Sequence, residues 1–171
     1  MKNLPFVVVS LVALLSAAPV LADDNINTSH IDQIGTNLSA TATQTGEGNT
    51  SDANIDQGLG VAGDLLVATI NQHGIDNIQD GQIIQDGTSQ MATIDQHGDG
   101  STNHALVDQD GTNNLANILQ NGTGNTNSVE IFQTGTGLLN IATVNQGGQN
   151  SSNTAGVTQI GGNLTATITQ N

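Results

Sequence analysis

The sequence predicts an all-β protein, a two-sheet β-solenoid of about six strand–turn–strand units. One short pattern built around a Gln recurs twelve times, and its fixed positions lie two residues apart, which is the period of a β-strand. Successive copies of that Gln are separated by 11, 13 or 15 residues, so the repeat extends over nearly the whole chain. A single pair of such strands buries too little apolar surface to fold alone. The units are therefore expected to stack on one another.

The first 22 residues are expected to be a cleaved signal peptide. Lys2 supplies a positive start, an apolar stretch covers 6–18, and Val20-Leu21-Ala22 provides a small-residue cleavage site. At about thirteen residues the apolar stretch is too short to span a bilayer, which disfavours the alternative of an uncleaved anchor and leaves no membrane span after cleavage. A short segment, 23–26, then precedes a repeat domain over 27–171. Its units cover about 27–50, 51–78, 79–102, 103–126, 127–152 and 153–171.

Each repeat is expected to form a seven-residue strand that ends at its Gln and turns one face inward. The Gln series is Gln33, Gln44, Gln57, Gln72, Gln85, Gln96, Gln109, Gln120, Gln133, Gln146, Gln159 and Gln170. Two residues before the Gln lies an apolar series, Ile31, Ile55, Ile70, Ile83, Ile94, Val107, Ile118, Ile131, Val144, Val157 and Ile168, with Ala42 as the exception. Four residues before the Gln lies Ala in nine copies, and six before it lies Asn in six. The positions between these are mostly polar and are expected to face water.

A Gly two residues after the Gln is expected to turn the chain, because Gly tolerates positive φ. These residues are Gly35, Gly46, Gly74, Gly87, Gly98, Gly111, Gly122, Gly135, Gly148 and Gly161. The connection that follows an even-numbered strand always has six residues, whereas the connection after an odd-numbered strand varies from 4 to 8. The repeating unit is therefore a strand pair of about 24 residues.

Stacking is expected to place identical positions one above another at about 4.8 Å. The two strands of one turn run in opposite directions, so the Ala of one strand faces the Ile or Val of the other, as Ala92 faces Ile83. Alternating small and large side chains keep the core at constant thickness. Because an unpaired buried amide costs roughly 1–3 kcal/mol, the inward Gln and Asn are expected to bond to their own copies along the axis as amide ladders.

The composition excludes several functions. After Lys2 the chain has no basic residue to set against its fifteen acids, which argues against binding nucleic acid. It also has no Cys and no clustered nucleophile, base and orienting group. The sequence therefore predicts neither an enzyme nor a cofactor, and the Gln repeat is interpreted as structural.

The repeats resemble those of the curlins, the secreted subunits of bacterial curli fibres. Two segments carry the resemblance most closely, Gln109-Asp-Gly111-Thr-Asn-Asn114-Leu-Ala116-Asn-Ile-Leu-Gln120 and Gln120-Asn-Gly122-Thr-Gly124-Asn-Thr-Asn127, and the pattern extends from Asn27 to Gln170. The resemblance implies a functional amyloid that polymerises with itself into adhesive extracellular fibres of a biofilm matrix. It further implies a nucleator subunit and an outer-membrane secretion pore as partners. With no basic residue near its C-terminus, this chain looks more like a major subunit.

Two groups of residues could bind a metal, but for both the favoured interpretation is that they are exposed turn residues. His73 and His97 each follow a repeat Gln and are expected to stack one turn apart, where solvent-exposed turn residues are the favoured interpretation. Asp86 and Asp110 occupy the equivalent turn position on the opposite edge, but the calcium-binding β-roll motif is absent apart from the fragment Gly98-Asp99-Gly100. No metal site is therefore predicted. A monomeric, calcium-dependent β-roll-like adhesin, or another surface-binding solenoid, remains the alternative function.

The acids predict a dependence on pH. Stacked carboxylates such as Asp86 and Asp110 repel one another, which raises carboxylate pKa values in the folded state. Assembly is therefore expected to strengthen as the pH falls.

Overall fold

The computed structural model describes residues 13–15, 25–58, 63–135 and 139–171. These residues form thirteen β-strands in two parallel sheets, which stack as a β-solenoid of about six turns, and they include no helix. The predicted fold class is confirmed. Within the described residues, no helix is long and apolar enough to cross a membrane.

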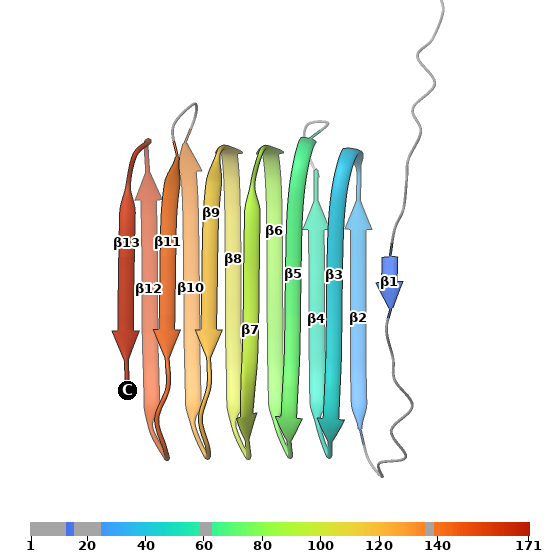
Figure 1. The fold of residues 1–171 in the computed structure, drawn as a ribbon, viewed down its shortest axis with the longest axis vertical. Coiled ribbons are helices and arrows are strands. Elements are labelled where there is room, and N and C mark those ends of the chain that lie inside the picture. Colours follow the sequence, from blue (N-terminus) through green and yellow to red (C-terminus); the bar gives the residue numbers. More distant parts are fainter. Residues whose placement is uncertain (1–12, 16–24, 59–62, 136–138) are drawn as a thin grey trace, which may run out of the picture.

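The chain passes from one sheet to the other at every turn, so odd-numbered strands form the first sheet and even-numbered strands the second. The first sheet contains β1 (Ala13–Leu15), β3 (Gly35–Glu47), β5 (Gly63–Ile75), β7 (Met91–Asp99), β9 (Asn114–Gln120), β11 (Asn140–Gln146) and β13 (Thr165–Gln170). The second sheet contains β2 (Ile26–Gln33), β4 (Thr50–Gln57), β6 (Ile78–Thr88), β8 (Thr102–Thr112), β10 (Thr126–Gly135) and β12 (Ser152–Ile160). Figure 1 shows that the strands of the two sheets run in opposite directions and lie across the direction in which the turns stack, which is the axis of the rod.

Register is kept at every level of the solenoid. Gln85 pairs with Gln109, and Gln109 pairs with Gln133. The insertion between β4 and β5 does not disturb this alignment, because Gln44 still pairs with Gln72 although they are 28 residues apart. A slip of one residue would turn every inward side chain to solvent, so burial of one face fixes the register.

The core lies between the two sheets and consists of the Ala positions and the Ile or Val positions. Ile55, Ile83, Ile118 and the other copies in the inner turns are fully buried, whereas Ile31 and Ile168 in the end turns are partly buried. The need for a small residue at the Ala position is visible at Gly81, where an added Cβ would lie 3.0 Å from Cγ2 of Ile70 on the opposite sheet. A small residue is therefore favoured opposite the Ile or Val of the other sheet, although Val129 is fully buried at the same position.

Two features of the strands were not expected from the sequence. Nine of the thirteen strands are longer than seven residues, because turn residues continue the pairing; Gly46, for example, pairs with Gly74. In addition, β1 falls within the predicted signal peptide and pairs with β3, with Ala13 opposite Ala40 and Leu15 opposite Ala42. The free backbone groups on the edge of β3 offer hydrogen bonds to any extended apolar segment within reach. The remaining residues of 1–24 lie outside the described part of the chain.

Candidate functional site

Two ladders of Gln side chains run along the rod, one for each sheet. Ten of the twelve Gln are buried, and Gln44 and Gln170, at the ends of the first sheet, are half-buried. In the second sheet each Nε2 donates to Oε1 of the next turn, from Gln33 through Gln57, Gln85, Gln109 and Gln133 to Gln159, at 2.7–2.8 Å. The first sheet has the same arrangement from Gln44 to Gln170, at 2.7–3.2 Å.

The second N–H of the Gln amides bonds across the core. Gln109 Nε2 donates to the carbonyl oxygen of Met91 at 3.2 Å, and Gln120 Nε2 donates to that of His104 at 2.9 Å. The acceptor in both cases precedes the Ala position of the opposite sheet. Each such Gln therefore joins its neighbours along the axis and also joins the two sheets. Sequence reasoning missed this bond, and no side-chain pattern marks it, because the acceptor is backbone.

A third ladder lies in the six-residue connections that lead from the first sheet to the second, after β3, β5, β7, β9 and β11. In the sequence these connections follow every second repeat counted from Gln33, and β1 shifts the strand numbers by one. Asn49 Nδ2 donates to the carbonyl oxygen of Gly74 at 2.7 Å, and its Oδ1 accepts the backbone N–H of Asn77 at 2.9 Å. Asn77 Oδ1 in turn accepts the backbone N–H of Ser101 at 2.8 Å. Sequence reasoning missed these residues. The signal was present, since Asn or Ser lies five residues after each of the five first-sheet Gln that are followed by a connection, at Asn49, Asn77, Ser101, Asn125 and Ser151.

The turn glycines leave no room for a side chain between successive turns. A Cβ at Gly111 would lie 1.8 Å from the carbonyl oxygen of Gly135, and one at Gly74 would lie 1.8 Å from that of Gly98. Eight of the ten have φ between 105° and 147°, whereas Gly98 and Gly135 do not have positive φ, so close stacking is the requirement there. Two residues further on, non-glycine residues adopt left-handed φ of 52–59°, at Asn37, Asp76, Ser89, Asn113, Asn150 and Asn163.

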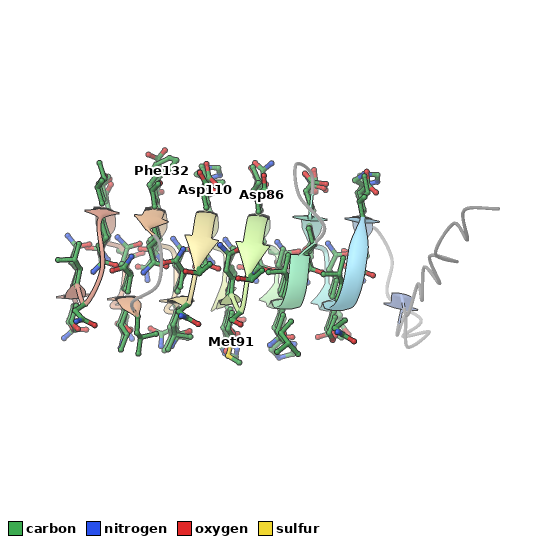
Figure 2. All side chains as sticks on the ribbon, turned by 90° about the horizontal axis from the view of Figure 1, so that it is seen from above. Asp86, Met91, Asp110 and Phe132 are labelled. Atoms are coloured by element: carbon green, nitrogen blue, oxygen red, sulfur yellow. The ribbon has the colours of Figure 1, made fainter. Side chains whose placement is uncertain are left out.

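The outer faces of the two sheets carry different charge. The strands of the second sheet place eight acids outward, Asp32, Asp52, Asp56, Asp80, Asp86, Asp108, Asp110 and Glu130. Figure 2 shows Asp86 and Asp110 projecting from this side of the rod and Met91 from the opposite side. We call the outer face of the second sheet the acidic face.

Within the acidic face, Asp86 pairs in register with Asp110. Burial raises the pKa of the nearby Asp108 carboxyl, because it disfavours the charged form, and the charge of Asp110 adds to the effect. Asp80 Oδ2 lies 3.0 Å from His104 Nδ1, within hydrogen-bond distance.

The two stacked imidazoles lie where the sequence suggested. The ring centroids of His73 and His97 are 5.1 Å apart, with the planes tilted by 41°, and His73 Nδ1 lies 2.7 Å from Thr45 Oγ1. Over the described ranges, no three His, Cys, Asp or Glu side chains come together in a way that could hold a metal ion. The contact of the His73 ring is therefore a hydrogen bond with the Thr45 side chain.

The two ends of the Gln ladders differ. In the first sheet, Gln44 Oε1 accepts a hydrogen bond from Ser29 Oγ at 3.0 Å, so Ser29 in place of the usual Ala completes that ladder. In the second sheet, Gln33 Oε1 is buried and has no hydrogen-bond partner among the described residues. Gln33 is only 8% exposed, so water has little access to this atom. A buried acceptor left unpaired costs roughly 1–3 kcal/mol. At the far end, Gln159 Nε2 donates at 3.0 Å to the carbonyl oxygen of Ile141, which occupies one of its two N–H groups.

Compared with family models, with curated proteins and with solved structures, the chain gives no match.

Proposed function

We propose that this protein is a structural subunit that polymerises end to end into an extracellular amyloid fibre. The observation that carries the proposal is the buried, unpaired Oε1 of Gln33 at one end of a ladder that continues without interruption to Gln159. A second copy stacked in register on β2 would bring its own Gln159 Nε2 to that acceptor. The contact between β12 and β13 of one copy and β2 and β3 of the next is called the junction below.

Backbone edges support the same arrangement. Within the described residues, β2 pairs only with β4, β12 only with β10 and β13 only with β11, so each has one edge without a strand. Such edges present rows of N–H and C=O groups to another chain. Pairing of β3 with the short apolar β1 is an example of a strand added at this end of the rod.

Side-chain rows at the two ends also match. Ile34 and Ile160 occupy the same position after their Gln and are 54% and 78% exposed, whereas Asp86 and Asp110 fill that position in the middle of the rod. In register, Ile160 of one copy lies next to Ile34 of the next, and Leu164 lies next to Leu38. Because exposed apolar residues at both ends become neighbours at the junction, polymerisation removes them from water.

Resemblance to the curlins supports the biological setting of this proposal. It favours a secreted, curli-type fibre for cell adhesion, surface colonisation and biofilm matrix, exported through an outer-membrane pore and started by a nucleator subunit. The chain acts as a scaffold in this proposal and has no catalytic role. The predicted signal peptide over 1–22 accords with export, and its removal would take β1 away from the edge of β3.

A substitution at Gly161 tests the junction. No atom lies within 4 Å of a Cβ added to Gly161, whereas the same Cβ at Gly111 or Gly135 would meet the next turn's carbonyl oxygen at 1.8 Å. In a fibre the next turn belongs to the second copy and presents its Gly35. We therefore expect Gly161→Ala to fold, with normal β circular dichroism, but to elongate at least tenfold more slowly in a thioflavin assay.

Gly100→Ala is the control for Gly161→Ala. Its Cβ likewise has no atom within 4 Å, and it lies in the middle of the rod, but its φ is 59° against 120° at Gly161. Because Ala is more strained at the larger φ, the urea midpoints of both variants are measured alongside elongation, and only slowing beyond the difference in stability counts for the junction. Elongation of Gly161→Ala at the rate of Gly100→Ala would refute the junction. A single low-mass species that forms only in calcium, and not with chelator, would instead support the monomeric adhesin.

A further inference from the structure

We propose that the outer face of the first sheet is the surface through which two filaments of this chain pack side by side, with the acidic faces left in solvent. The inference rests on the proposed function, because it concerns the filament that end-to-end polymerisation produces. The partner is a second copy of the same filament, contacting through the same face.

Charge separates the two faces of the rod. The acidic face has eight carboxylates, and after Lys2 the sequence has no Lys or Arg to neutralise them. At the outward positions one, three and five residues before each Gln, the second sheet carries six of these acids and the first sheet carries one, Asp95. Glu47 and Asp99 of the first sheet lie at its turn edge, beyond the Gln. Two acidic faces therefore repel each other at close range more strongly than two faces of the first sheet. We call the latter the neutral face.

An apolar row runs along the neutral face parallel to the rod axis. Val67, Met91, Leu115 and Ile141 are register neighbours on β5, β7, β9 and β11. All four side chains point outward, and Met91 is 47% exposed. This row differs from the sequence expectation that outward positions are mostly polar. Beside it runs a row of small β-branched residues, Thr69, Thr93 and Thr143, interrupted by Asn117.

A second copy fits this face better than an unrelated partner does. Two neutral faces have the same axial repeat of about 4.8 Å, so rows of side chains can interdigitate over the full length of two filaments. Sheets that pack in this way lie about 10 Å apart, which excludes water from the apolar row.

The area of the neutral face makes pairing depend on polymerisation. One subunit offers about seven residues by six strands, roughly 20 Å by 29 Å, or about 600 Å². A stable binary interface needs about 800 Å² from each partner, so two single subunits are expected not to pair. In a filament, contact between one pair of subunits holds the neighbouring subunits of the two filaments close together. Each neighbouring pair then adds the same contact, so weak contacts sum to stable pairing.

The test compares the same substitution on the two faces. Leu115→Asp places a carboxylate in the apolar row of the neutral face, and Leu106→Asp places one on β8 in the acidic face; both leucines are half-buried and point outward. Filaments of each variant are grown at low concentration, and the fraction of paired filaments is counted by negative-stain microscopy. Thioflavin elongation rates are measured on the same samples.

We expect wild-type and Leu106→Asp filaments to pair, and Leu115→Asp filaments to remain single, with the paired fraction reduced at least tenfold at an unchanged elongation rate. Thr93→Asp serves as a second variant of the neutral face, should Leu115→Asp fail to fold. Equal pairing of the Leu115→Asp, Thr93→Asp and wild-type filaments would overturn the inference. So would loss of pairing in Leu106→Asp to the same extent.

Two further outcomes separate this inference from the function on which it rests. Wild-type filaments that form but stay single, and that sediment with phosphatidylcholine vesicles through the neutral face, would refute pairing while leaving polymerisation intact. Wild-type protein that forms no filaments at all would refute the proposed function itself.

Discussion

A single Gln holds three parts of this fold together. Gln109 Oε1 accepts from Gln85, and its Nε2 donates both to Gln133 and to the carbonyl oxygen of Met91. Gln109→Ala would leave a donor on Gln85 and an acceptor on Gln133 unpaired in a fully buried ladder, at roughly 1–3 kcal/mol for each. We expect a lower denaturation midpoint and a longer lag in fibre formation. Asn117→Ala, on the exposed face of β9, is the control and should leave both measurements unchanged.

At the scale of the residue, the sequence predicted best which side chains point inward. It predicted least well which atoms those side chains bond to. A period of two fixes which face Gln109 occupies, whatever residues lie between. That period does not reveal that Gln109 bonds to Met91, because any residue there offers the same carbonyl oxygen. In the sequence, Ser29 only interrupts the Ala series, although its hydroxyl completes the first-sheet ladder at Gln44.

At the scale of the element, the Asn ladder explains why one set of connections has constant length. Asn77 binds the turn before it and the turn after it, so a change in loop length would break both bonds. The opposite edge tolerates insertions, as the longer connection between β4 and β5 illustrates. The constant six-residue spacing was visible in the sequence. It predicted the two-strand unit but was not linked to Asn77, because exposed Asn is also common in turns without any ladder.

Replacing Asn77 tests this ladder. Asn77→Ala removes the acceptor of the Ser101 backbone N–H and the donor to Gly98, and we expect a loss of roughly 1–3 kcal/mol for each buried group left unpaired. The measurement is the urea midpoint of soluble protein, with Asn145→Ala on the outer face of β11 as the control. Equal midpoints for the two variants would mean that the turn backbone is held without the Asn side chain.

For the whole molecule, the two-sheet solenoid followed from the repeat because stacking is the one way to bury so few apolar residues per strand. Details that depend on the surroundings of a single residue did not follow. The raised pKa of Asp108 is such a detail, because burial of this carboxyl raises it first and the charge of Asp110 adds to the effect. Burial of an outward residue depends on its neighbours in adjacent turns, which a period of two does not describe.

The raised pKa of Asp108 gives assembly a defined pH dependence. A carboxyl pKa raised in the folded state means that the folded form binds the proton more tightly than the unfolded form. Stability therefore increases as the pH falls from above the folded-state pKa to below the ordinary value, and it decreases in the opposite direction. Repulsion between the carboxylates of the acidic face also weakens as the pH falls, so it likewise favours assembly at lower pH. Salt screens this repulsion, because the Debye length falls from about 8 Å at physiological ionic strength to about 3 Å at 1 M.

We accordingly expect faster elongation at about pH 5 than at about pH 8, with the difference shrinking in molar salt. Asp108→Asn should elongate faster than wild type at the higher pH and respond less to acidification, because the substitution removes the group that must otherwise be charged where it is partly buried. Asp95→Asn removes the same charge from the neutral face and is the control, measured by thioflavin lag time. If Asp95→Asn and Asp108→Asn changed the pH response equally, net charge alone, and not the surroundings of Asp108, would govern assembly.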